Sequence, residues 1–343
     1  MTNDSNFFQA NLFGWTYVYA NGKFHIIPDV EYEIPQTLYK YYALTPNSVD
    51  ALMNTYIYAT HPNQLNDRLD CYEQLIDFDT PDTIREFFGE YETIVDFLNL
   101  PDEQLFTKEN RKHFQHMFKI LVYQKFGVLS MSEGFDNMLM WAHYAQNSGF
   151  CLELDYTQFP FNYSGPFPVN YQESFSPIKL SKTPLESAIA AQSNVKNKIW
   201  EYEKEWRVII HAPEKFIMKT FGYWHGANQF ANHNRKFYYP VTAIKSIILG
   251  FSFFSWGELS SESGKSLWNV NLDSKNKNYY LKKEILDFII DNDIVVGIIQ
   301  PKNMNKFTPI PIHMHRVTDS PQSYVLCELN WNNYKRNLKP QIK

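Results

Sequence analysis

The stretch WEYEKEWRVII, at residues 200–210, says most about the fold of this 343-residue chain. Charged residues at 203, 205 and 207 and apolar residues at 206, 208 and 210 each recur at every second position, a period of two that is typical of a β-strand with one buried face. The alternation predicts a strand over 203–210 with Glu203, Glu205 and Arg207 on one face. Two carboxylates about 6–7 Å apart beside a cation can stabilise a developing positive charge, and the alternative interpretation is a solvated strand face.

A second polar pattern lies upstream of this strand. The segment GVLSMS, at residues 127–132, predicts a compact strand that ends in hydroxyl groups. Ser130 and Ser132 share one face of that strand because side chains alternate along it. The next strand is expected over 150–155.

A helix is predicted between these two strands, over about 136–146. Its residues Trp141 and Tyr144 belong to an apolar stripe at helical spacing, which is ordinarily part of a core. His143 stands beside the stripe, where a hydrogen-bonded structural histidine is the usual finding.

An earlier strand places a lysine among tyrosines. The run LYKYY predicts a strand over 38–42, and Thr45 followed by Pro46 predicts the start of a helix. Lys40 either extends its charged end to solvent along the packed tyrosines or contacts a ligand together with Tyr41.

The rest of the chain alternates helices and strands without a repeat or a linker. A single α+β domain is therefore expected over 36–315, with a central mixed, mostly antiparallel sheet flanked by helices. An Asn-Gly turn at residues 21 and 22 predicts a hairpin elaboration at 1–35, and 316–343 is expected to hold a C-terminal strand and a basic tail. Helices are also predicted near 81–125, 183–200 and 283–291, and strands near 56–60, 237–240, 244–249, 294–299 and 324–329.

The composition excludes several classes of protein. A net charge of −5 with 44% hydrophobic residues indicates a globular chain and argues against broad nonspecific binding to nucleic acid. Three cysteines without metal-ligand spacing, and the lack of a signal or membrane-spanning pattern, predict a cytoplasmic protein that does not contact a membrane. There is no Gly-rich phosphate loop and no G-x-S-x-G elbow, and the spacing of His313 and His315 favours a surface pair over a metal site.

Together these segments resemble a bacterial family classified as a domain of unknown function. The resemblance covers roughly 38–300 and rests on the combination of the motifs. Asp70 stands where the family has Glu, and Arg68 and Leu69 stand where it usually has Pro and Phe. The matching motifs are Lys40-Tyr41, Asn66-Asp67, Met140-Trp141-Ala142-His143-Tyr144 with Gly149-Phe150-Cys151, and Trp200 to Arg207.

The order of the elements is also similar to that of the mono-ADP-ribosyltransferases, which have a strand with a basic residue, then an S-x-S strand, then an E-x-E strand. The resemblance implies an ADP-ribosyltransferase-like core in which Lys40 contacts NAD in place of the usual Arg or His. Ser130 and Ser132 would shape the nicotinamide pocket. Glu205 would be catalytic, and Glu203 would take the position of target-choosing residues.

This second resemblance implies an NAD-consuming toxin or phage-defence effector that needs no metal. Cleavage of the nicotinamide–ribose bond passes through an oxocarbenium-like cation, which a nearby carboxylate stabilises while aromatic side chains stack on nicotinamide. The expected acceptor is a nucleic acid or a protein, and an antitoxin or another defence protein is an expected partner. The implied catalytic residues are Glu205, Glu203 and Arg207, and the implied NAD-binding residues are Lys40, Tyr41, Asn66, Asp67, Ser130, Ser132, Trp141, His143 and Tyr144.

Two alternatives remain open from the sequence. The first is a nuclease in which Asn66, Asp67, Glu203 and Glu205 bind a divalent metal ion. The second is a non-catalytic binding module, such as an antitoxin or a sensor of phage proteins, whose aromatic groove recognises a partner.

Overall fold

The computed structural model describes residues 7–89, 94–123, 126–211, 235–261, 267–303, 306–317 and 320–328. The chain divides into two compact units, each assembled from three segments. Unit 1 comprises Met1–Ile34, Tyr58–Ser130 and Phe161–Phe237, and unit 2 comprises Pro35–Ile57, Met131–Pro160 and Tyr238–Lys343.

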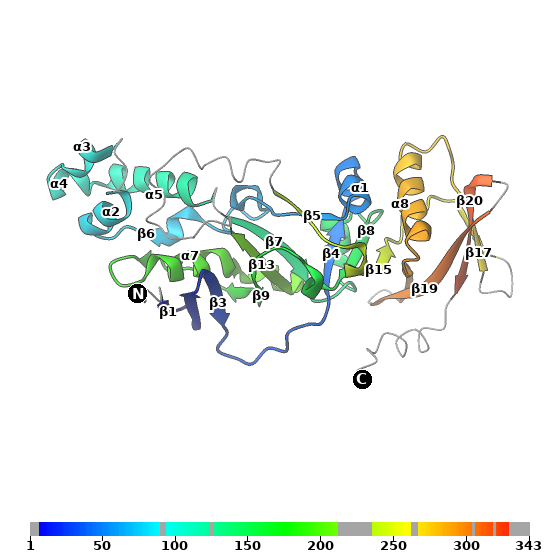
Figure 1. The fold of residues 1–343 in the computed structure, drawn as a ribbon, viewed down its shortest axis with the longest axis horizontal. Helices are drawn as coiled ribbons and strands as arrows, with labels where there is room; N and C mark the ends of the chain where they lie inside the picture. The colour runs from blue at the N-terminus through cyan, green and yellow to red at the C-terminus, as the bar shows by residue number, and fades with distance from the viewer. Residues whose placement is uncertain are drawn as a thin grey trace. The chain divides into compact units, whose positions relative to one another are not determined.

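Unit 1 begins with a three-stranded antiparallel meander that helix α7 (Leu185–Asn194) covers (Figure 1). Asn21 and Gly22 both have positive φ, 52° and 77°, as a two-residue hairpin turn of the favoured type requires. The predicted hairpin is therefore confirmed, and a further strand pairs with it. The three strands are β1 (Phe7–Leu12), β2 (Trp15–Ala20) and β3 (Lys23–Ile27).

A helical part of unit 1 has a core built largely from phenylalanine rings. The ring of Phe87 lies 4.4 Å from that of Phe88 and 5.3 Å from that of Phe118. All three rings are buried, which accounts for part of the aromatic content of the chain without a functional role. The predicted helical character of 81–125 is confirmed by α2 (Pro81–Phe88), α3 (Val95–Leu98), α4 (Asp102–Leu105) and α5 (Lys108–Tyr123).

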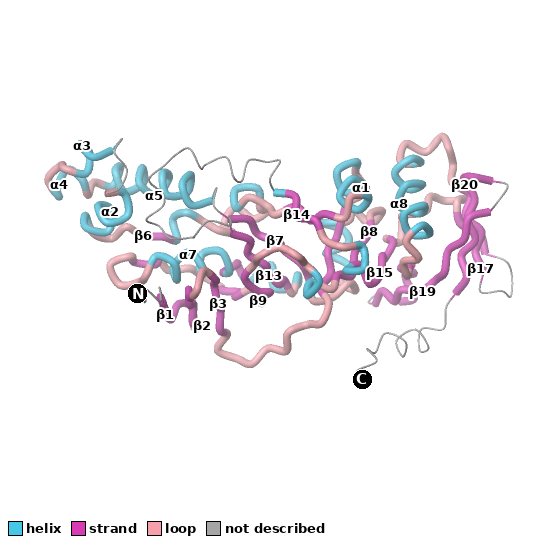
Figure 2. Tube along the Cα trace, viewed as in Figure 1, coloured by secondary structure: helices cyan, strands magenta, loops and turns pink. Residues whose placement is uncertain are grey.

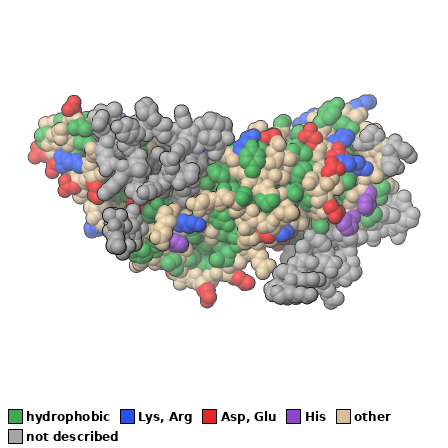
Figure 3. All heavy atoms as spheres, viewed as in Figure 1, with side chains coloured by type: hydrophobic (Ala, Val, Ile, Leu, Met, Phe, Trp, Pro, Cys, Tyr) green, Lys and Arg blue, Asp and Glu red, His purple; other side chains and the backbone are tan. Residues whose placement is uncertain are grey.

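Exposed acidic side chains gather over the short helices α2, α3 and α4 (Figure 3). They lie in the first turns of these helices, where the backbone N–H groups favour negative charge. These acidic residues therefore have a structural explanation. They are Asp82, Asp96, Asp102 and Glu103.

Three longer strands of unit 1 lie side by side in the order β7, β13, β9. They are β7 (Phe126–Ser132), which continues into unit 2, β13 (Glu205–His211) and β9 (Ser164–Pro168), and β13 runs antiparallel to β9. Short parallel pairs join β10 (Asn170–Gln172) to β12 (Val195–Asn197) and β6 (Ile76–Asp77) to β11 (Ile178–Lys179). The 3-10 helices η1 (Pro62–Gln64), η2 (Glu73–Leu75) and η5 (Lys198–Glu203) complete this unit.

Unit 2 contains a mixed sheet in the order β16, β17, β20, β19, β18, β15, β8, β4. Five of these strands, β8, β15, β17, β19 and β20, are labelled in Figure 2. Its neighbours are antiparallel except for the parallel pair of β15 and β18. The strands are β4 (Leu38–Tyr42), β8 (Phe150–Leu154), β15 (Ile244–Leu249), β16 (Leu259–Ser261), β17 (Leu267–Asn271), β18 (Val296–Asn303), β19 (Lys306–Val317) and β20 (Ser320–Glu328).

Helices α1 (Pro46–Met53) and α8 (Tyr279–Asp291) of unit 2 pack against each other, and α8 also lies on β19. Thr45 caps α1 and forms a reciprocal capping box with Ser48, as its position before Pro46 predicted. Helix α6 (Met138–Tyr144) packs on β4. The remaining elements are β5 (Tyr56–Tyr58), β14 (Lys236–Tyr238), η4 (Tyr156–Gln158) and η9 (Val241–Ala243).

The predicted mixture of helices and strands, with a mixed and mostly antiparallel sheet flanked by helices, is confirmed. The domain boundaries at 35 and 315 stay predictions, and the basic tail falls in 329–343, outside the described residues. In the part of the chain that the structure describes, none of the helices combines the length and the apolar composition needed to cross a membrane.

Candidate functional site

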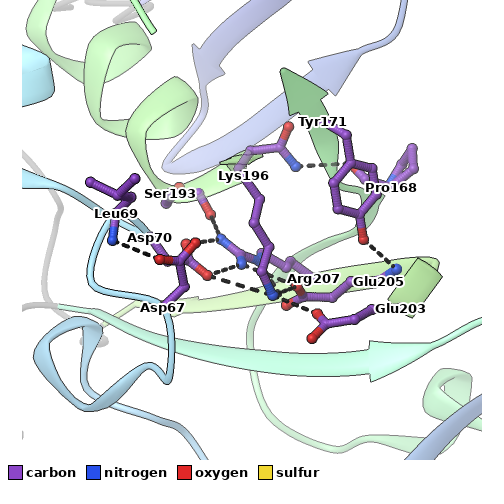
Figure 4. Close-up of polar contacts among 11 residues, drawn as sticks. Asp67, Leu69, Asp70, Pro168, Tyr171, Ser193, Lys196, Glu203, Glu205 and Arg207 are labelled. Carbon is purple, nitrogen blue, oxygen red and sulfur yellow. Dashed lines mark hydrogen bonds and ion pairs between the residues drawn. The ribbon is translucent and has the colours of Figure 1, made fainter. Parts of the chain in front are cut away.

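Five charged side chains of unit 1 are gathered in its interior (Figure 4). Each of the five residues is at most 5% exposed, whereas such side chains are almost never fully buried unless they are paired. We call this group the buried charge cluster. Its members are Asp70, Lys196, Glu203, Glu205 and Arg207.

The end of α7 brings one cluster residue, Lys196, and the carbonyl of Ser193 to the cluster. The predicted helix over 183–200 is too long, since α7 stops at Asn194 and Lys196 lies on the following strand, β12. The carbonyl of Ser193, in the last turn of α7, accepts a hydrogen bond from Arg207 at 2.8 Å. This tertiary contact satisfies a carbonyl that the end of the helix leaves open.

Glu203 and Glu205 come from different elements, although alternation predicts one strand. Glu203 is the last residue of η5, and β13 begins at Glu205. Lys204 between them has a left-handed backbone with φ 43°, which is uncommon for a residue other than glycine. Both carboxylates nevertheless contact the same ammonium group, that of Lys196.

The backbone of Glu205 is fixed on both sides. Its N–H donates to the hydroxyl of Tyr171 at 2.9 Å, and its carbonyl accepts from the N–H of Val169 at 3.0 Å. Its side chain also has a hydrogen bond with Ser130 on β7. Glu205 is therefore positioned by two segments of unit 1, its backbone by residues 169–171 and its side chain by β7.

Arg207 joins two carboxylates through both edges of its guanidinium group. It donates to Asp70 at 2.8 and 2.5 Å and to Glu205 at 2.9 and 3.2 Å. With the bond to Ser193, all five N–H donors of Arg207 have an acceptor. The side chain is 0% exposed, so this paired geometry is closed to solvent.

Lys196 has a different environment from Arg207. Its ammonium nitrogen lies 2.5 Å from Glu203, 2.9 Å from Glu205 and 3.9 Å from Asp70. It also lies 5.2 Å from the ring centroid of Trp200, within range of a cation–π interaction. Lys196 thus donates two hydrogen bonds to carboxylates, and the ring of Trp200 lies beside its ammonium group.

The cluster holds three carboxylates and two cations, which leaves a formal charge of −1 when all are ionised. Burial alone raises the pKa of Glu205, but Arg207 and Lys196 outweigh burial and hold that pKa well below its ordinary range. For Asp70 the balance is opposite, since burial raises its pKa more than Arg207 lowers it. Burial lowers the pKa of Lys196, but the carboxylates around it, Glu205 foremost, raise that pKa overall.

Within unit 1 the structure brings Ser130, Glu203, Glu205 and Arg207 together, but the predicted strand face is confirmed only for Glu205 and Arg207, because Glu203 ends η5 before the strand begins. Asp67 instead shapes the turn before Asp70. Its side chain accepts from the N–H of Leu69 at 2.9 Å, and Asn66 on the same turn is exposed (Figure 4). The predicted contact of Asn66 and Asp67 with NAD stays a prediction.

The other predicted site residues lie in unit 2. Tyr41 packs edge-on against Trp141 with 5.2 Å between ring centroids, and its hydroxyl donates to the carbonyl of Gly134 at 3.0 Å. Lys40 points to the opposite face of β4 from Tyr41, because neighbouring strand residues alternate.

On α6 the predicted site residues differ in burial. Trp141 is buried, with its indole N–H donating to the carbonyl of Phe135, whereas His143 is exposed and Tyr144 is half-buried. Ser132, at the end of β7, is buried and pairs with Tyr39 in unit 2. The roles of these residues toward NAD stay predictions.

Sequence reasoning missed two members of the cluster, Asp70 and Lys196. Lys196 fell inside a helix that was predicted too long, and its exact spacing from Glu203 carried no motif. Asp70 was visible only as a difference from the resembling family. The one sequence feature that could have indicated Asp70 is its position directly before the hydrophobic Cys71. The carbonyl of Cys71 accepts a hydrogen bond from the hydroxyl of Tyr123, which ties this turn to α5.

The carboxylates of the cluster do not form a metal-binding arrangement. Glu203, Glu205 and Asp70 face Lys196 or Arg207, and in the described part of the chain no group of three or more His, Cys, Asp or Glu could hold a metal ion. His313 and His315 are exposed on β19 with their ring centroids 6.4 Å apart, as expected for alternate residues of one strand.

A family model described as "Protein of unknown function (DUF2971)" matches residues 140–208. The predicted resemblance to a family of unknown function is confirmed for this segment, which runs from α6 into β13 and contains four of the five cluster residues. Asp70 lies outside it. No curated protein and no solved structure matches the chain significantly.

Proposed function

We propose that this chain is an NAD-consuming, ADP-ribosyltransferase-like enzyme in which Glu205 is the catalytic carboxylate. In the reaction the bond between ribose C1′ and the nicotinamide nitrogen breaks, and its electron pair leaves with nicotinamide. A nucleophile of the acceptor then forms a bond to C1′ and releases its proton. The acceptor is a nucleic acid or a protein, and the biological role is that of a toxin or phage-defence effector.

The observation that carries this proposal is the contact between Ser130 and Glu205. It joins the strand with the S-x-S pattern to the strand with the E-x-E pattern. In unit 1 these strands, β7 and β13, are neighbours in the sheet. A serine hydroxyl that donates to a carboxylate orients it and leaves its negative charge in place.

The charge of the cluster also suits the proposed chemistry. A carboxylate stabilises an oxocarbenium-like transition state best when it is ionised before the reaction starts. The lowered pKa of Glu205, which Arg207 and Lys196 maintain against burial, keeps it ionised at neutral pH. The excess of one negative charge then favours a developing positive charge nearby.

Arg207 is assigned a positioning role within this proposal. All five of its N–H groups are already used by protein acceptors, so it has none left for a substrate phosphate. Arg207 acts through Glu205, because it donates hydrogen bonds to both carboxylate oxygens of that residue. Asp70 in turn fixes Arg207 in position.

The test is the substitution Glu205→Gln, which keeps the size of the side chain and removes its charge. We expect NAD turnover by the purified chain, followed as nicotinamide release, to fall at least about 100-fold, in the range found when one charge-stabilising group is removed. Circular dichroism and the unfolding midpoint show that the variant is folded.

Glu201→Gln is the matched control, because Glu201 is exposed on the same 3-10 helix and is expected to leave turnover unchanged. Unchanged turnover in Glu205→Gln would refute the assignment. Cleavage of nucleic acid that disappears on addition of EDTA would favour the metal-dependent nuclease class instead.

A further inference from the structure

Lys196 occupies a cage that is built for a positive charge. Its ammonium group is bounded by the carboxylates of Glu203 and Glu205, at 2.5 and 2.9 Å, and by the ring of Trp200, at 5.2 Å from the centroid. Two carboxylates and an aromatic face are the surroundings that bind ammonium and pyridinium groups.

Two residues of the cage, Trp200 and Glu203, belong to η5. Trp200 is half-buried on that turn and packs against the half-buried ring of Tyr202, with 6.1 Å between ring centroids. The indole N–H of Trp200 is buried and has no hydrogen-bond partner among the described residues. An aromatic ring near the ammonium group of Lys196 and a donor without a partner thus belong to the same short 3-10 helix as the carboxylate of Glu203.

For Glu205 to contact a substrate cation directly, the ammonium group of Lys196 has to move. A unit charge 2.9 Å from the carboxylate already neutralises much of its field. A second cation can approach Glu205 closely only if the ammonium group withdraws. Arg207, fixed on five acceptors, is not free to make room in this way.

We propose that Glu203, Glu205 and Trp200 form a binding subsite for a cationic aromatic ring, which the ammonium group of Lys196 occupies in this structure. The cation that enters displaces Lys196 and stacks on Trp200, and a carbonyl substituent on the ring accepts the indole N–H. The identity of the cation rests on the proposed function, in which it is the pyridinium ring of NAD.

The experiment measures binding by calorimetry, without turnover, and uses two probes that differ in charge. 1-Methylnicotinamide, which is methylated on the ring nitrogen, is a pyridinium cation with a carboxamide, and nicotinamide is its neutral counterpart. Each is titrated into the wild-type chain, Lys196→Met and Lys198→Met. The last is the matched control, because Lys198 is exposed on the same segment and pairs with Glu173 instead.

We expect 1-methylnicotinamide to bind Lys196→Met at least tenfold more tightly than it binds the wild type or Lys198→Met. Nicotinamide should not show this gain. Adding Trp200→Leu to Lys196→Met should weaken binding of the cation about 2- to 30-fold, the range that corresponds to a cation–π contact. Equal affinities of the cation for wild type and Lys196→Met, or an equal gain for nicotinamide, would overturn the subsite.

Lys196→Met removes the ammonium group from between two buried carboxylates, of which Glu205 keeps Arg207, and therefore risks misfolding. The double variant Lys196→Met/Glu203→Gln retains the formal charge of −1 and is measured in parallel, with Glu203→Gln alone as its reference. The expected gain over that reference is again at least tenfold for the cation, and a gain of less than twofold contradicts the proposal.

The outcomes separate this inference from the proposed function. If NAD turnover is absent while the cation binds Lys196→Met more tightly, the subsite stands and the transferase assignment falls. If turnover depends on Glu205 while cation affinity does not respond to Lys196, the subsite alone is refuted.

Discussion

Arg207 and Lys196 are both buried cations beside Glu205, yet their side chains can do different things. The planar guanidinium group of Arg207 pairs with two carboxylates at once, and its acceptors fix its position. The ammonium group of Lys196 sits on a flexible stem and is held through two hydrogen bonds. Arg207 is therefore suited to holding a carboxylate in place, and Lys196 is suited to moving.

The ionisation of Glu205 predicts a specific dependence of stability on pH. Since its pKa is lower in the folded chain than in the unfolded chain, its contribution to stability is present above the ordinary glutamate pKa, near 4.5, and is lost as pH falls below that value. We expect the unfolding free energy of the wild type to fall more steeply below pH 4.5 than that of Glu205→Gln, by up to about 1.4 kcal/mol per pH unit.

Urea unfolding of both proteins at several pH values between 3 and 7 measures the two slopes. Comparison with Glu205→Gln isolates this one group from the other carboxylates, including Asp70, whose pKa shift has the opposite sign. Parallel curves for the two proteins would show that Glu205 has no lowered pKa in the folded chain.

At the residue scale, the sequence predicted the members of the cluster that share local periodicity. Glu205 and Arg207 lie two apart on β13, so alternation places them together wherever the strand lies. Asp70 meets Arg207 across 137 residues of chain, and no period or spacing links them. Such contacts depend on the tertiary fold, which a single sequence does not encode in any local pattern.

At the scale of elements, the predictions that succeeded rest on strong local signals. The capping residues of α1 and the Asn-Gly turn between β2 and β3 work through the backbone next to them, so distant packing does not alter them. The prediction for the end of α7 was wrong because the helix end makes contacts that are distant in sequence. The side chain of Asn194 donates to the carbonyl of Pro168, and the carbonyl of Ser193 accepts from Arg207.

The junction of α6 and β8 in unit 2 gives a testable case. A Cβ atom at Gly149 would lie 1.9 Å from the carbonyl oxygen of Tyr42 and 2.8 Å from that of Ala145. Because both neighbours are backbone, relief requires β4 or α6 to shift. We expect Gly149→Ala to lower the unfolding free energy by at least about 2–3 kcal/mol, measured by urea unfolding.

Gly134→Ala is the matched comparison in the same unit. There the added atom would meet a movable carboxylate oxygen of Asp136 at 3.3 Å, and a change within about 0.5 kcal/mol is expected. Similar stabilities of the two variants would contradict the close approach of the backbone at Gly149.

At the scale of the whole molecule, each unit is completed by segments from distant parts of the chain. Removing everything after Phe237 takes β15–β20 and α8 away from unit 2 and leaves β8 without its partner β15. We expect the fragment 1–237 to aggregate or to unfold without a cooperative transition, as measured by size-exclusion chromatography and thermal unfolding.

A chain cut at the exposed turn between Ser274 and Lys275, with both pieces retained, is the control and should keep a cooperative transition. A fragment 1–237 that is monomeric and melts like the whole chain would show that unit 1 folds without the remainder of unit 2.

The interleaving of the two units also restricts how such a chain can diversify. The path changes unit after residues 34, 57, 130, 160 and 237. No single genetic recombination event can therefore exchange one unit whole and leave the other whole, because every crossover point divides the segments of at least one of them. Variation among relatives of this chain is then expected to accumulate by substitution and by insertion into loops, with hybrid genes requiring compensating changes in the interior.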